Sequence, residues 1–125
     1  MLLIEDRFLD EKRFADLFAG NKFKLKRWGR IKIAQALRKK KVAAPLITSA
    51  LNTEIDEVDY IDCMHYLIER KMKELKIGSK KERKATITGK IVRYLQQKGY
   101  ESDTAWSETK QFIDKQNHLI RPRRP

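Results

Sequence analysis

The fold is decided by residues 9–51, which read LDEKRFADLFAGNKFKLKRWGRIKIAQALRKKKVAAPLITSAL. Apolar residues recur in this stretch at steps of three and four, which is the spacing of amphipathic helices. Capping residues, glycine and proline then predict where each helix starts and stops. The expected helices run from Asp10 to Gly20-Asn21, from about Lys26 to Lys40, and from Pro45 to Asn52.

All charges between Lys22 and Lys41 are positive, with ten basic residues and no acidic one. A face that only meets solvent usually mixes both signs, although a purely solubilising role is the alternative interpretation. We expect this face to lie along a polyanionic or acidic partner. Together with a second basic group, the candidate partner- and nucleic-acid-binding residues are Lys22, Lys24, Lys26, Arg27, Arg30, Lys32, Arg38, Lys39, Lys40, Lys41, Lys80, Lys81, Arg83 and Lys84.

The second half of the chain predicts a further unit of three helices. Apolar residues recur at helical spacing up to Gly78, which ends the first of them, and residues 79–82 have the spacing of a capping box. The next helix ends at Gly99, and Ser102 is placed to cap the last one. From Asn117 onward the sequence has no period, so we expect a disordered basic tail.

The middle helices of the two units match at an offset of 58 residues. Together with the shared order of three helices, this match predicts an internal repeat. One unit alone is too small for a stable core, so we expect an all-α molecule of tandem three-helix repeats, elongated and curved. The identical pairs are Lys32 and Lys90, Ile33 and Ile91, Leu37 and Leu95, and Lys40 and Lys98.

The composition narrows the class of protein further. A net charge of +12 over 125 residues favours nucleic acid or another anionic partner. The single cysteine, Cys63, excludes an internal disulfide and suits a reducing compartment. No apolar stretch reaches the roughly 20 residues that span a bilayer, and the short opening run resembles no signal peptide. A cytoplasmic monomer without membrane contact is expected.

Few residues suggest catalysis or metal binding. His65 lies on an apolar stripe and is interpreted as a core histidine rather than a ligand. One cysteine and two histidines cannot supply the usual four ligands of zinc. Because no glycine-rich phosphate loop or serine nucleophile motif is found either, we expect no enzyme activity and no cofactor.

Two features of the first unit bear on nucleic-acid recognition. Trp28, inside the basic run, either packs at the joint between helices or stacks on a partner. The third helix, as a recognition helix of a helix-turn-helix, would offer only Thr48, Ser49 and Asn52 as polar groups. Any DNA contact is therefore expected to reach phosphates without reading the sequence.

Several of these segments resemble the RecX family of regulatory proteins, over about residues 4–114. That family has an acidic pair before Arg-Phe-Ala, a Gly-led helix ending in Leu-x-x-Lys-Gly, and a helix ending in Ala-Leu. The matching runs are LDEKRFA at 9–15, WGRIKI at 28–33, ALRKKKV at 36–42, LITSAL at 46–51, and IVRYL with KGY in the second unit.

The resemblance implies a bacterial cytosolic modulator of the RecA recombinase, acting in DNA repair, homologous recombination and the SOS response. Such a protein would lodge in the groove of the RecA filament on DNA and restrain ATP hydrolysis and strand exchange. The implied partners are RecA and single- or double-stranded DNA, the latter through phosphates. An alternative is a free-standing, non-specific nucleic-acid-binding helical protein.

This sequence departs from the family pattern in two ways. Lys41 stands where the family usually has glycine. The repeat normally found before Leu9 is represented only by Leu2 to Phe8, so a fragment or a shortened member is expected. The expected division is a remnant at 1–8, three-helix repeats at 9–54 and 55–116, and a tail at 117–125.

Overall fold

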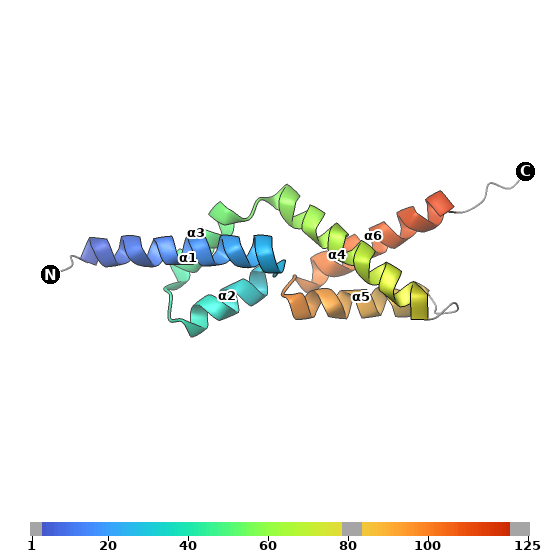
Figure 1. The fold of residues 1–125 in the computed structure, drawn as a ribbon, viewed down its shortest axis with the longest axis horizontal. Coiled ribbons are helices and arrows are strands. Elements are labelled where there is room, and N and C mark those ends of the chain that lie inside the picture. Colours follow the sequence, from blue (N-terminus) through green and yellow to red (C-terminus); the bar gives the residue numbers. More distant parts are fainter. Residues whose placement is uncertain (1–3, 79–83, 121–125) are drawn as a thin grey trace, which may run out of the picture.

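The computed structural model describes residues 4–78 and 84–120, and no strand occurs in these ranges. The predicted all-α fold is confirmed. Short links join consecutive helices within each described range, as Figure 1 shows. The helices are α1 (Ile4–Lys26), α2 (Arg30–Lys39), α3 (Ala44–Glu54), α4 (Glu57–Gly78), α5 (Lys84–Lys98) and α6 (Ser102–Ile120).

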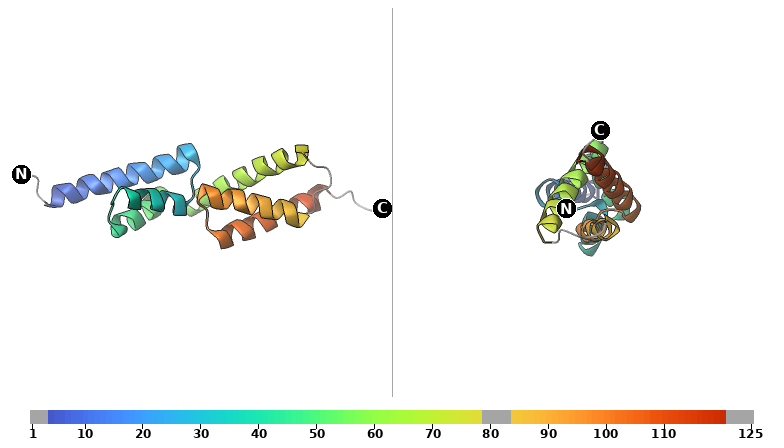
Figure 2. Two further views of the ribbon diagram at one scale, coloured as in Figure 1. Left: turned by 90° about the horizontal axis from the view of Figure 1, so that it is seen from below. Right: turned by 90° about the vertical axis from the view of Figure 1, so that its right-hand side faces the viewer.

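The six helices form two three-helix units placed end to end (Figures 1 and 2). Helices α1, α2 and α3 pack on one another, and so do α4, α5 and α6. The molecule is elongated: α1 begins at one end of it, and α6 finishes at the other end. This is the arrangement of tandem three-helix repeats that the matched middle helices predicted.

The first helix is longer than the sequence suggested. We predicted a start at Asp10 and a stop at Gly20-Asn21, but α1 begins at Ile4 and continues to Lys26. The stop was wrong because Gly20 is buried where α1 packs on α3: a Cβ there would lie 2.9 Å from Oε1 of Glu54. The helix continues through this position because its packing on α3 overrides the local stop signal.

Other helix limits were predicted more closely. Helix α4 ends at Gly78 and α5 at the residue before Gly99, as expected, and α6 begins at Ser102. The second helix begins at Arg30 rather than Lys26, since α1 occupies residue 26. Disorder from Asn117 is wrong for residues 117–120, which belong to α6. The capping box at 79–82 and residues 121–125 lie outside the described residues.

Helices α2 and α5 end in the same way. At the end of α2, the amide of Val42 donates to the carbonyl of Leu37 and Lys41 has φ 63°. At the end of α5, the amide of Tyr100 donates to the carbonyl of Leu95 and Gly99 has φ 100°. Both are Schellman motifs with a left-handed residue after the helix, and they lie at the 58-residue offset.

Candidate functional site

The candidate residues between Lys22 and Lys41 lie on the C-terminal part of α1, on α2 and on the links beside α2. Six of them are exposed: Lys24, Lys26, Arg38, Lys39, Lys40 and Lys41. Four are partly buried: Lys22, Arg27, Arg30 and Lys32. Lys80, Lys81 and Arg83 lie outside the described residues, and Lys84 is the first residue of α5, with no described side chain.

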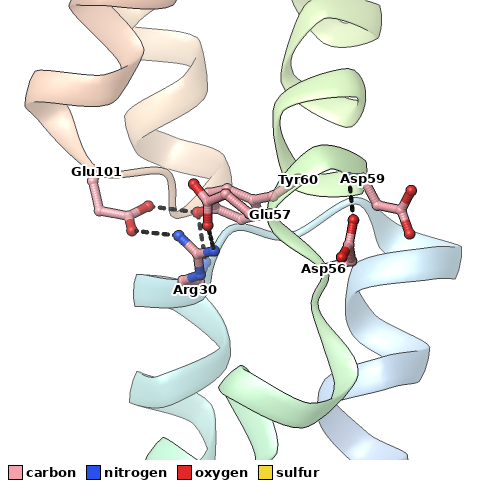
Figure 3. Close-up of polar contacts among 6 residues, drawn as sticks. All are labelled: Arg30, Asp56, Glu57, Asp59, Tyr60 and Glu101. Carbon is pink, nitrogen blue, oxygen red and sulfur yellow. Dashed lines mark hydrogen bonds and ion pairs between the residues drawn. The ribbon is translucent and has the colours of Figure 1, made fainter.

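Arg30 is partly buried at the joint between the two units (Figure 3). Its guanidinium pairs with Glu57 at the start of α4 and, at 3.2 Å, with Glu101 before α6. It also lies 3.9 Å from the ring centre of Tyr60, whose hydroxyl donates to Glu101. Two carboxylates therefore satisfy this cation within the chain.

The electrostatics of the joint favour fixed protonation states. Burial alone would lower the pKa of Arg30, but the hydrogen bonds to Glu57 and Glu101 raise it overall. Burial and the hydrogen bond to Glu101 raise the pKa of Tyr60 far above its usual value. Burial and the contact with the Cys63 thiol do the same for the pKa of Tyr100. Arg30 stays charged and both phenols stay neutral at ordinary pH.

The backbones of the two units also touch. The amide of Gly29 donates to the carbonyl of Lys98 at 2.7 Å, and the amide of Ile31 donates to that of Gly99 at 2.9 Å. A Cβ on Gly29 would lie 2.3 Å from the carbonyl carbon of Gly99. Amides at the start of α2 therefore satisfy carbonyls at the end of α5. Only glycines allow the two backbones to come this close.

Trp28 lies in the link between α1 and α2, beside this joint. The indole is partly buried against the core, as one of the two sequence interpretations proposed. The ammonium groups of Lys22 and Lys32 lie 4.8 and 4.5 Å from its ring centre. These contacts are cation–π interactions, which hold lysine side chains in place.

Trp28 and Lys32 also line an open hollow on α2, together with Gln35, Ala36, Arg38 and Lys39. No carboxylate is among these lining residues. In the described parts of the chain, Arg30 is the only candidate residue that pairs with an acidic side chain. The exposed candidates therefore give α1 and α2 a positive surface, with which no carboxylate of the described residues forms an ion pair.

Sequence reasoning missed Lys98, which the fold brings to this surface. Its ammonium donates to the carbonyl of Lys26 at 3.0 Å, across the joint. Burial and the nearby charge of Lys32 lower the pKa of Lys98. The match of Lys98 with Lys40 in the repeat gave no sign of this, because only the joint places the end of α5 beside α2.

Residues expected to be structural are partnered within the second unit. His65 was expected in the core, but its side chain is 39% exposed and binds Oε1 of Glu108 through Nε2 at 2.7 Å. The expected core position was therefore wrong, because His65 is only partly buried, but the imidazole is hydrogen-bonded within the chain. No group of three or more His, Cys, Asp or Glu in the described ranges could hold a metal ion. None of the helices described is long and apolar enough to cross a membrane.

These features define a helical-repeat protein with a basic surface on α1 and α2. The family model for the second three-helix domain of RecX matches residues 10–51. "Regulatory protein RecX" of Clostridium tetani (strain Massachusetts / E88) is 33% identical over 113 residues, which cover 90% of this chain and 48% of that protein. The chain belongs to the RecX family. It spans about half the length of this relative, and no solved structure matches it significantly.

Proposed function

We propose that this chain regulates the RecA recombinase in the cytoplasm, by binding the RecA filament and restraining its ATP hydrolysis and strand exchange. Its membership of the RecX family carries the proposal. The positive surface on α1 and α2 supports it, because a filament of protein on DNA offers phosphates along its whole length. We assign the binding to exposed cations and exclude Arg30, which is paired at the joint.

The test adds the protein to preformed RecA filaments on single-stranded DNA and follows ATP hydrolysis and co-sedimentation. We expect slower hydrolysis and binding that weakens as salt rises. Reversing Arg38, Lys39 and Lys40 to glutamate should weaken binding several-fold and flatten its salt dependence, since fewer counterions are released. These side chains are exposed, so the fold should survive.

A matched control reverses the exposed residues Lys73, Lys110 and Lys115, which changes the net charge equally on the second unit. Similar losses in both triple variants would mean that net charge alone governs binding. Unchanged hydrolysis together with no co-sedimentation of the wild type would refute the proposal.

The second candidate is a non-specific nucleic-acid-binding protein without a recombinase partner. The positive surface on α1 and α2 supports this function equally well, since it requires only phosphates. Equal affinity for naked DNA and for RecA filaments on the same DNA would favour it. Tighter binding to the filament would favour the RecA regulator.

A further inference from the structure

Helices α5 and α2 follow one another end to end along one side of the molecule (Figures 1 and 2). The amides of Gly29 and Ile31 meet the carbonyls of Lys98 and Gly99, so the contact has a fixed geometry. A Cβ on Gly99 would lie 2.3 Å from Cβ of Lys32. The joint therefore places Lys32 of the first unit beside the end of α5 in the second unit.

Four cations from three segments gather at this point, and we call them the joint cluster: Lys26, Arg27, Lys32 and Lys98. Lys98 is fixed by its hydrogen bond to the carbonyl of Lys26. The next residues of this segment lie beside Arg27 and Lys32, since the hydroxyl of Tyr100 donates to the carbonyl of Arg27 at 3.0 Å and a Cβ on Gly99 would meet Lys32. Burial and the charges of Lys32, Arg27 and Lys26 accordingly lower the pKa of Lys98. No carboxylate of the described residues forms an ion pair with any of them.

Such a cluster opposes folding, because each cation gains little from its neighbours and repels them. An anion bound among them would offset that repulsion. The joint cluster is also continuous with the hollow on α2, since Lys32 belongs to both. A positive path therefore runs from Lys98 across the joint to Arg38 and Lys39.

We propose that the joint cluster binds phosphates of a nucleic-acid backbone, which continues along the hollow on α2. This inference rests on the proposed function, which supplies the filament that contains DNA. Both units must contribute, so the site exists only when the joint is intact. Lys98 belongs to the binding surface although it lies outside the basic run at 22–41.

The chemistry of the cluster favours phosphodiesters over acidic protein side chains. Lysine, a flexible point charge that commonly binds phosphate, supplies three of the four cations. The guanidinium of Arg27 lies 4.2 Å from the ring centre of Tyr66, so its face is already engaged. A linear polyanion with regular charges also suits a path that crosses two units.

The test compares the double variant Lys32→Gln/Lys98→Gln with the control Lys110→Gln/Lys115→Gln, which loses the same charge from exposed positions on α6. Glutamine keeps a donor for the carbonyl of Lys26, and circular dichroism checks the fold. Binding to a labelled oligothymidine and to a duplex of equal length is measured by anisotropy at several salt concentrations.

We expect the joint variant to bind the single strand several-fold more weakly, with the slope of log K against log salt reduced by about 1.4, or about 1.8 for a duplex. The control should keep the wild-type slope. A loss with only one of the two probes identifies which nucleic acid supplies the phosphates.

The joint site would be refuted by a wild-type slope in the joint variant, by an equal loss in the control, or by no DNA binding of the wild type. Weaker binding of the joint variant to DNA-free RecA, with DNA binding intact, would assign the cluster to acidic protein groups and also refute it. In another outcome, the wild type does not bind RecA filaments, but the salt slope of DNA binding still falls in the joint variant. That result would refute only the proposed function.

Discussion

At the scale of single residues, the left-handed positions after α2 and α5 differ in what occupies them. Gly99 adopts φ 100° without steric cost, whereas Lys41 adopts φ 63° at the corresponding position. A lysine in this region carries about 1–3 kcal/mol of backbone strain. The first unit therefore holds a local instability that the second unit lacks.

Replacing Lys41 by glycine should raise the free energy of unfolding by about 1 kcal/mol, because the strain disappears while the Schellman hydrogen bonds remain. Urea denaturation measures the change. Lys40→Gly removes the same charge from a residue with φ −84°, so it should bring no gain. Equal effects of the two substitutions would show that charge, not backbone conformation, decides.

At the scale of elements, periodicity predicted the existence of the helices and their apolar faces. Ile91 and Leu95 of α5 are fully buried, as are Ile33 and Leu37 of α2, and the repeat pattern alone had matched these pairs. The length of α1 could not be predicted, because the stop signal at Gly20 is overridden by packing against α3. Local signals cannot reveal which helix will cover a glycine.

Truncating Leu95 to alanine should cost roughly 2–5 kcal/mol of unfolding free energy, the usual cost of emptying a buried leucine site. Denaturation tests this expectation.

His65→Gln changes a partly exposed pair with Glu108 and should leave filament binding intact. Co-sedimentation measures the binding. Loss of binding by a folded His65 variant would mean that the surface between α4 and α6 contacts the partner.

At the scale of the whole molecule, the joint decides the shape and could not be predicted. It depends on Gly29 meeting Gly99 and on Arg30 meeting Glu101, residues that lie far apart in the sequence. The basic run did predict much of the candidate surface, but charge counting treated Arg30 as free and overlooked Lys98. Both errors arise because tertiary contacts determine which cations are neutralised.

The two buried phenols at the joint predict a loss of stability in alkali. Tyr60 and Tyr100 have pKa values raised by burial, so each must stay protonated in the folded state. Their contribution is complete below the ordinary tyrosine pKa of about 10 and is lost as the pH rises toward the folded pKa, by about 1.4 kcal/mol per pH unit for each phenol.

Urea unfolding between about pH 9 and pH 12 would measure this slope. Tyr60→Phe should remove about half of it, since one ionisable phenol remains. An unfolding free energy that stays level over this range would show that the joint opens and lets the phenols ionise in the folded protein.

The backbone contact between the units also bears on self-assembly. The contact needs a glycine before α2, which is Gly29, and another after α5, which is Gly99. After α2, the position related to Gly99 by the repeat offset holds Lys41, whose side chain would occupy the space that this close contact needs. A fibre made of copies of this chain would need the same joint between the end of α2 in one copy and the second unit of the next copy. Lys41 prevents that contact, so the joint couples the two units of one chain without extending into a fibre.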